Sequence, residues 1–142
     1  MWQIVRCNED DYESLVGIWE RSVRATHDFL TEAAFNEIRA ALVPCYFPGV
    51  DLYAIADKGS FVGFIGLSAD TIEMLFIDAG CRNHGYGSAL IDFAKRKGAV
   101  KVNVNEQNPS ALKFYEAKGF RVIARDETDG DGRPYPILHL SL

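Results

Sequence analysis

Cysteine is scarce in this sequence. Cys7, Cys45 and Cys81 are odd in number and lie far apart among the 142 residues. That pattern argues against a disulfide framework and against a zinc site, so we expect no metal. No apolar run approaches the roughly 20 residues of a membrane span, and residues 2–5 are too short for a secretory signal. The cytoplasm is therefore the simplest compartment, with no membrane partner.

Positive charge is in the minority. The chain has 15 Lys and Arg against 20 Asp and Glu, a net charge of −5. Proteins that bind nucleic acid usually carry a basic surface, so we expect no nucleic-acid partner. Hydrophobic residues make up 48% and charged residues 25%, as in ordinary globular domains. At this length we expect one domain over residues 1–142, which buries roughly 68–70% of its unfolded surface.

Hydrophobic periodicity predicts strands and helices in the order βααβββαβαββ. The expected strands cover residues 3–7, 52–56, 61–67, 71–77, 100–104, 120–125 and 137–142. Asn8 and Thr31 are the expected N-caps of the first two helices, and Asn108 that of the last, 109–118. The third helix is expected at residues 88–97. This order indicates an α/β fold of mixed α+β type, with a twisted mixed sheet of about seven strands flanked by four helices.

A glycine-containing turn, Arg82-Asn83-His84-Gly85-Tyr86-Gly87, joins the strand at 71–77 to the third helix. A helix N-terminus presents unpaired N–H groups and partial positive charge, which together bind anions, phosphate above all. Gly85 and Gly87 let the backbone approach the anion, and Arg82 adds a permanent cation. The P-loop is excluded because Tyr86-Gly87 replace its Lys-Ser/Thr. The dinucleotide-binding motif is excluded because Leu90 stands where its third glycine is required.

Two motifs resemble the GNAT superfamily of N-acetyltransferases. Leu75-Phe76-Ile77 followed by the Arg82–Gly87 turn resembles its coenzyme-A motif, Arg/Gln-x-x-Gly-x-Gly/Ala. The segment 105–108, with Ala111, Phe114-Tyr115 and Gly119-Phe120, resembles its second motif. Residues 103–108 and 25–27 are also similar to the small bacterial YjaB-type acetyltransferases. The order of elements agrees over the whole chain, with one departure: Ala79 stands where the family often has proline.

The resemblance implies a single GNAT-like domain that uses acetyl-CoA as cosubstrate. The pyrophosphate is expected on backbone N–H groups from about Asn83 to Ser88, and the pantetheine arm between the splayed fourth and fifth strands, paired with the backbones of Leu75 and Ile77. The residues implied to bind acetyl-CoA are Leu75, Phe76, Ile77, Arg82, Asn83, His84, Gly85, Tyr86, Gly87, Ser88, Asn108 and Tyr115. A backbone N–H in this region is also expected to polarise the thioester carbonyl.

Tyr115 is the candidate general acid. A positioned phenol, with an ordinary pKa of about 10, can protonate the departing thiolate, whose thiol has a pKa of about 8.5. The alternative is a packed aromatic beside Phe114.

Glu73 is the candidate base, because an acceptor amine must lose a proton before it attacks. We expect its side chain on the same face as Leu75, two residues on, where partial burial would raise its pKa. The alternatives are an exposed carboxylate or a water chain.

Three residues are expected at the acceptor site. His27 and Phe29 lie between the first two helices, the segment that covers this site in the family, and Asn103 lies on the fifth strand. His27 is also a candidate proton relay, since its ordinary pKa is near 6.5. The alternative for His27 is a packing residue at a helix end.

The sequence therefore predicts an acetyl-CoA-dependent N-acetyltransferase, with direct attack of a primary amine in a ternary complex. No cysteine has a neighbouring histidine that would indicate an acyl-enzyme. Two alternatives stay open: a non-catalytic acyl-CoA-binding sensor and a nucleotide-binding oxidoreductase. The acceptor is a small molecule or a protein amine, and the chain is a monomer or a homodimer.

Overall fold

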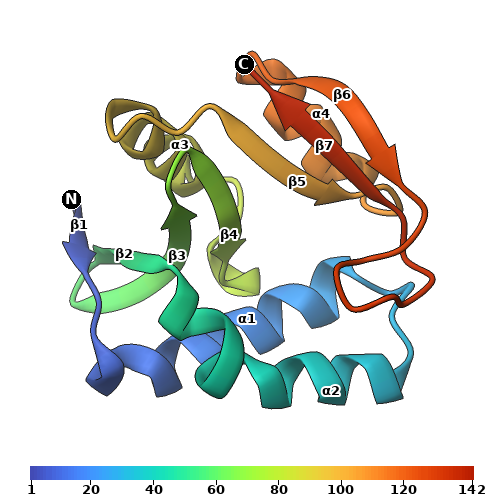
Figure 1. The fold of residues 1–142 in the computed structure, drawn as a ribbon. Coiled ribbons are helices and arrows are strands. Elements are labelled where there is room, and N and C mark those ends of the chain that lie inside the picture. Colours follow the sequence, from blue (N-terminus) through green and yellow to red (C-terminus); the bar gives the residue numbers. More distant parts are fainter.

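The computed structural model describes every residue from Met1 to Leu142. Its strands are β1 (Trp2–Arg6), β2 (Asp51–Asp57), β3 (Ser60–Ser68), β4 (Thr71–Ile77), β5 (Lys101–Asn105), β6 (Arg121–Asp126) and β7 (Ile137–Ser141). Its helices are α1 (Tyr12–Thr26), α2 (Glu32–Ala41), α3 (Tyr86–Arg96) and α4 (Pro109–Ala117). The predicted order of elements and the mixed α/β class are confirmed (Figure 1). No helix combines the length and the apolar composition that crossing a membrane requires.

The seven strands form one sheet in the order β1-β2-β3-β4-β5-β7-β6. Every neighbouring pair is antiparallel except β4 and β5. These two strands run parallel and pair only through Thr71 with Lys101 and Ile72 with Val102. Beyond Ile72 the strands diverge, so the sheet opens into a wedge between its two halves (Figure 1).

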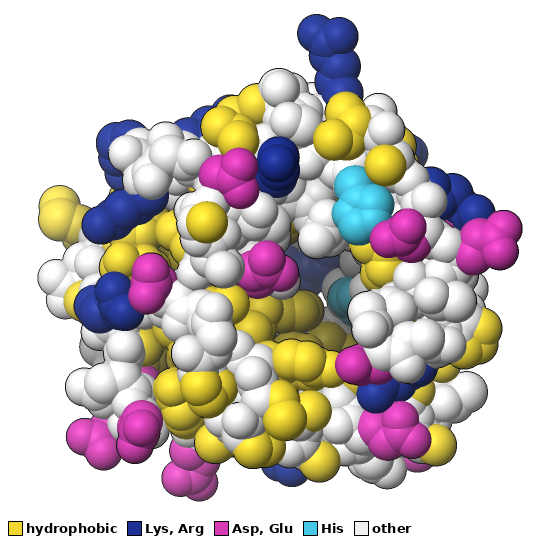
Figure 2. Space-filling view, viewed as in Figure 1, with side chains coloured by type: hydrophobic (Ala, Val, Ile, Leu, Met, Phe, Trp, Pro, Cys, Tyr) yellow, Lys and Arg dark blue, Asp and Glu magenta, His cyan; other side chains and the backbone are white.

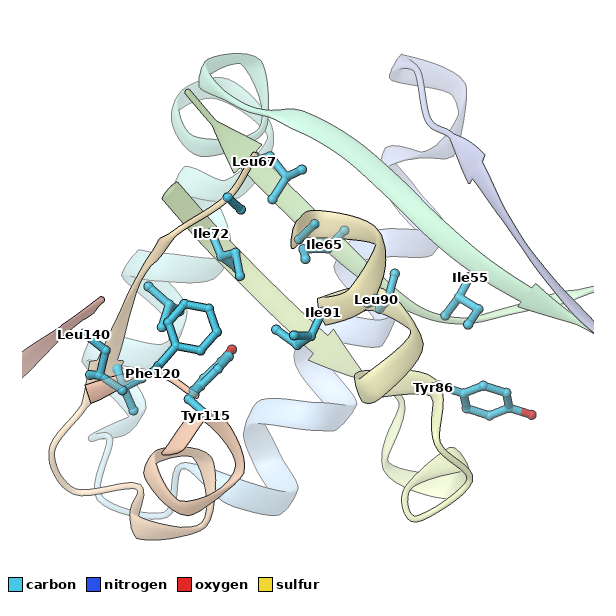
Figure 3. Packing of buried hydrophobic residues seen from close by; sticks show 14 of the residues in the cluster. Ile55, Ile65, Leu67, Ile72, Tyr86, Leu90, Ile91, Tyr115, Phe120 and Leu140 are labelled. Carbon is cyan, nitrogen blue, oxygen red and sulfur yellow. The ribbon is translucent and has the colours of Figure 1, made fainter. Parts of the chain in front are cut away.

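Two hydrophobic clusters cover the two faces of the sheet. On one face α1 and α2 pack with residues such as Trp19, Phe35 and Phe64. On the other face α3 and α4 pack over a cluster that includes Leu90 and Ile91, both fully buried (Figure 3). Burying a side chain of this size stabilises the fold by about 1.5–3 kcal/mol. The cluster on the α3–α4 face includes residues of both halves of the sheet, so it holds the two halves together across the wedge.

The predicted caps are present at the helix ends that border the wedge. Thr31 Oγ1 accepts a hydrogen bond from Ala34 N (3.1 Å), and Asn108 Oδ1 accepts one from Ala111 N (3.3 Å). Asn8 instead caps a short 3-10 turn that leads into α1, through a bond from Asp10 N (2.9 Å). These bonds satisfy donors that a helix start leaves free.

Strand β4 carries a bulge at Glu73. Met74 is opposite Gly66 while Ile72 is opposite Leu67, so Glu73 has no partner residue on β3. A bulge inserts one residue and reverses the alternation of side chains beyond it. The expectation that Glu73 shares a face with Leu75 is therefore wrong, because it assumed an unbroken strand.

Candidate active site

The turn before α3 presents a run of free backbone donors. None of the N–H groups from Arg82 to Ser88 donates to another backbone group; the first that does so is Ala89 N, to Gly85 O (3.1 Å). Gly85 has φ +81°, a left-handed conformation that favours glycine. The Arg82 side chain is exposed and forms no ion pair or hydrogen bond within the chain. Consecutive free N–H groups beside an unpaired cation are the arrangement that can bind an anion, as the sequence predicted.

This turn is fastened at both ends. Arg21 on α1 donates from Nε and Nη2 to both oxygens of Asp78, at 2.8–3.1 Å. At the other end Tyr86 Oη donates to Asp57 Oδ2. The Tyr86 ring is buried in the cluster on the α3–α4 face, at the opposite end from Tyr115 (Figure 3). Only the backbone of Tyr86 is therefore available to an anion.

The glycine at position 87 has a packing role. A Cβ there would lie 3.2 Å from Cζ of Phe114, on α4. Glycine at position 87 therefore lets α3 approach α4 closely, in addition to the anion contact that the sequence suggested, and a Cβ there would require the Phe114 ring to shift. At Gly85, by contrast, a Cβ would meet open space, so glycine is favoured there by the left-handed backbone conformation and not by packing.

A cavity of about 510 Å³, here called the donor cavity, extends from this turn into the wedge. Of the residues expected to bind acetyl-CoA, all but His84 line it: Leu75, Phe76, Ile77, Arg82, Asn83, Gly85, Tyr86, Gly87, Ser88, Asn108 and Tyr115. Asp78 N bonds to Val62 O (2.9 Å) across the β3–β4 ladder. Because antiparallel ladders alternate, Leu75 and Ile77 direct their backbone groups away from β3 and into the wedge.

Tyr115 lies on α4 at the inner end of the donor cavity. The residue is 7% exposed, and its ring packs edge-on against Phe114 and Phe120, at centroid distances of 5.3 and 5.9 Å. Figure 3 shows Tyr115 beside Phe120. The Tyr115 hydroxyl has no hydrogen-bond partner in the chain, yet it is not sealed from the cavity. Burial raises its pKa, so the phenol stays protonated at neutral pH. The hydroxyl is therefore free to donate to a ligand.

A second cavity of about 490 Å³, the acceptor cavity, lies on the α1–α2 face of the sheet. Twelve of its 18 lining residues are hydrophobic, and Figure 2 shows a hollow with a largely apolar floor. Only His27 and Phe76 line both cavities. The two cavities therefore meet at these side chains, within the wedge.

His27 is held in one orientation at this junction. Thr26 Oγ1 donates to Ser22 O (2.8 Å) and lies 2.7 Å from His27 Nδ1. The only hydroxyl proton of Thr26 is then used in the bond to Ser22 O. The His27 Nδ1–H therefore donates to Thr26 Oγ1, and His27 Nε2 carries the lone pair. Burial lowers the pKa of His27 to about 4, against a smaller opposing effect of Asp28. The imidazole is therefore neutral at pH 7, with one free acceptor nitrogen.

Glu73 lines the acceptor cavity together with Met74 and Phe76, on the opposite side of β4 from Leu75. Its carboxylate is exposed, so the burial expected from the sequence is also wrong. The bulge accounts both for the side of β4 on which Glu73 lies and for the exposure of its carboxylate.

Phe29 and Asn103 line neither cavity. Phe29 packs between His27 and Tyr135, with ring centroids 5.2 and 5.8 Å away. Asn103 Oδ1 lies 2.7 Å from His139 Nδ1 on the open face of β5 and β7. The strand residue that does line the acceptor cavity is Asn105, two positions further along the same face.

The lining residues that the sequence analysis did not predict include Asn105, Asp129 and Tyr135. Asn105 could have been found, because it opens the second motif. Asp129 and Tyr135 lie in the connection between β6 and β7, whose path over the sheet has no local sequence signal.

Comparison with known proteins places these features in a family. Residues 21–136 match the model of the acetyltransferase (GNAT) domain. The chain is 41% identical over 142 residues to the peptidyl-lysine N-acetyltransferase YjaB of Salmonella typhimurium, covering 99% of this chain and 97% of that protein. Its counterpart from Escherichia coli is 41% identical over 140 residues, covering 97% and 95%.

Solved structures agree with the sequence comparison. The solution structure of apo-form YjaB from Escherichia coli has a TM-score of 0.91 at 39% identity, covering 99% of this chain and 97% of that chain. The PaiA N-acetyltransferase of Thermoplasma acidophilum, solved in complex with coenzyme A, shares the fold with a TM-score of 0.73 at 18% identity, covering 100% and 99%. These relatives favour a transferase over the sensor and the oxidoreductase.

Proposed function

Because this chain belongs to the GNAT family of N-acetyltransferases, we propose that it transfers the acetyl group of acetyl-CoA to the ε-amine of a protein lysine. The observation that carries the proposal is the meeting of two cavities at His27 and Phe76, one ending in an anion site and the other largely apolar. The name peptidyl-lysine N-acetyltransferase, given to relatives that are 41% identical, supports lysine as the acceptor.

The donor cavity fits acetyl-CoA in its chemistry. The free N–H groups from Arg82 to Ser88 and the unpaired Arg82 guanidinium suit the pyrophosphate. The backbones of Leu75 and Ile77, which face the wedge, would pair with the amide groups of the pantetheine arm as an added strand would. Asn108 both caps α4 and lines this cavity, so its amide is also available to the arm.

Tyr115 would act as the general acid. When the amine attacks the thioester carbonyl, the C–S bond breaks and the sulfur leaves with negative charge. A hydroxyl without another partner can donate to this sulfur without breaking a bond in the protein. Burial raises the pKa of the phenol, but the same apolar surroundings disfavour a thiolate, so the proton transfer is not made harder by burial alone.

The acceptor cavity suits the side chain of lysine. Its apolar walls can hold the four methylene groups, while the exposed Glu73 carboxylate attracts the ammonium at the mouth. Glu73 would take the first proton from the ammonium. His27 Nε2, neutral and at the junction, would accept a hydrogen bond from the attacking amine and take up its second proton as the C–N bond forms, and the imidazolium, with a pKa of about 4, would then release that proton to water.

Mass spectrometry on peptides tests the function. We expect acetyl-CoA and a lysine peptide to yield a product 42 Da heavier, roughly the mass that one acetyl group adds, with release of one CoA for each acetyl group. The same peptide with its lysine replaced by norleucine is the control. Acetylation of free polyamines or amino acids, with none of lysine peptides, would overturn the proposed acceptor.

A further inference from the structure

Arg21 on α1 and Asp78, the residue directly after β4, form an ion pair beside the donor cavity, here called the clamp. Arg21 Nε donates to both Asp78 oxygens, at 3.0 and 3.1 Å, and Arg21 Nη2 donates to Oδ2 at 2.8 Å. The Asp78 side chain is only 17% exposed, and a paired contact of this kind fixes the orientation of both groups. Neither residue lines the donor cavity, so the clamp can act on a bound ligand only through its neighbours.

Asp78 is the point at which the chain leaves the sheet and enters the turn before α3. Its N–H donates to Val62 O on β3 (2.9 Å), and its carbonyl accepts a hydrogen bond from Cys81 N (2.8 Å). Ile77 before it and Cys81 after it both line the donor cavity. The direction in which the chain enters the turn therefore depends on how Asp78 is held.

Helix α1 is the other partner in the clamp. Ser22, Thr26 and His27, which follow Arg21 on this helix and at its C-cap, all line the donor cavity. The clamp thus ties the turn that carries the free N–H donors to the helix that ends where the two cavities meet. A fixed separation of these two sites matters for acetyl-CoA, because its pyrophosphate and its acetyl group must fit at the same time.

Gly17 leaves the space in which the Arg21 guanidinium lies. A Cβ at Gly17 would be 3.1 Å from Arg21 Nη1, one turn further along α1. Glycine in the interior of a helix is destabilising relative to alanine, and Gly17 has no positive φ that would call for it. A second feature of α1, independent of the hydrogen bonds, therefore points to the same contact.

We propose that Arg21 is a positioning residue for the cosubstrate: its bond to Asp78 holds the turn before α3 in the conformation that binds the pyrophosphate of acetyl-CoA. The clamp aligns the turn with α1 before the ligand binds, so less conformational freedom is lost on binding. The inference rests on the proposed function and deepens it, because it names residues outside the donor cavity that determine its affinity for CoA.

Calorimetry with CoA tests the clamp without any acceptor. We expect Arg21→Ala and Asp78→Asn each to raise the Kd for CoA by about two- to fivefold, the range of one partly exposed ion pair. Arg24→Ala is the matched control and should leave the Kd unchanged. Arg24 also lies on α1 and also donates two hydrogen bonds to one carboxylate, but that carboxylate belongs to Glu32 on α2, away from the turn.

The Asp78→Asn variant separates positioning from simple charge. Removal of a negative charge near the turn should by itself strengthen the binding of an anion, whereas loss of the clamp weakens it. The double variant Arg21→Ala/Asp78→Asn should bind CoA no more weakly than the weaker of the two single variants, because both changes break the same contact.

Gly17→Ala supplies a readout in which stability and affinity do not fall together. Alanine favours the helix, yet its methyl group displaces the guanidinium. CoA should therefore bind more weakly than in the parent, while urea unfolding shows no loss of stability. In the Arg21→Ala background the same change should leave the affinity for CoA unaltered. An affinity equal to the parent's in Gly17→Ala alone would contradict the role of Gly17.

The two proposals fail in different ways. A parent protein that does not bind CoA overturns the proposed function and the clamp inference with it. A parent that binds CoA overturns the clamp inference alone if the affinity is unchanged in Arg21→Ala, is higher in Asp78→Asn, or falls equally in Arg24→Ala.

Discussion

Replacement of Tyr115 by phenylalanine separates catalysis from packing in this site. The substitution keeps the ring, which packs against Phe114 and Phe120, and removes only the hydroxyl. Since that hydroxyl has no hydrogen-bond partner in the chain, no bond is lost on mutation. The free energy of unfolding should therefore change by less than about 0.5 kcal/mol, well below the roughly 1 kcal/mol of a lost hydrogen bond.

The effect on rate should be much larger. A positioned general acid contributes about 10²- to 10⁴-fold, which corresponds to about 3–5 kcal/mol of transition-state stabilisation. The affinity for acetyl-CoA should change little, because the anion site and the β4 backbone are untouched. The expected pattern is a low kcat with nearly normal stability and CoA affinity.

Rapid-quench measurement of a single turnover, with enzyme in excess over acetyl-CoA, reports the chemical step directly. Steady-state rates alone can conceal the effect, because product release limits many enzymes. Calorimetry with CoA and urea unfolding supply the two controls. A single-turnover rate within about twofold of the parent would show that Tyr115 is a packing residue.

Three further outcomes follow from the geometry. Gly87→Val should weaken CoA binding in calorimetry and also destabilise the fold by about 1–3 kcal/mol, because its Cβ would crowd Phe114 at 3.2 Å. An unchanged affinity for CoA would contradict this placement of the pyrophosphate. Glu73→Gln should lower turnover at neutral pH without changing CoA affinity, and an unaltered pH–rate profile would move the base to His27 or water. The folded state holds the pKa of the His27 imidazole at about 4. As the pH falls, the unfolded chain therefore binds a proton on this imidazole before the folded state does. Stability should therefore fall as pH drops from about 6.5 towards 4, by at most about 3 kcal/mol, and urea titrations of His27→Gln should lack that part of the slope.

The sequence predicted the parts of the site that local rules determine. Thr31 and Asn108 cap helices because a side-chain oxygen at that position satisfies free N–H groups, whatever the tertiary context. The free backbone donors from Arg82 to Ser88 were predictable for the same reason: a strand, a glycine turn and a helix suffice to orient them. The order of elements followed from periodicity and from the family motifs.

Features that depend on contacts across the sheet could not be predicted in this way. The side of β4 on which Glu73 lies depends on a register shift against Gly66 and Leu67 of β3, and the sequence of β4 alone reads as an unbroken strand. The connection between β6 and β7, residues 127–136, likewise consists of turn residues that predict a loop but not its direction. Its path depends on the hydrogen bonds of Arg133 to Glu37 and of Tyr46 to Asp131, and both partners are distant from this connection in the sequence.

The bulge at Glu73 explains how one strand serves two cavities. Glu73 directly follows Ile72, the last residue of β4 that pairs with β5. Because the inserted residue reverses the alternation, Leu75 stays with Ile72 on the α3 face, while Met74 and Phe76 turn towards α1. The same residue thus marks the point where the sheet opens and places a carboxylate at the acceptor mouth. The backbone of Leu75 is left facing the wedge, where the family motif requires an open strand edge.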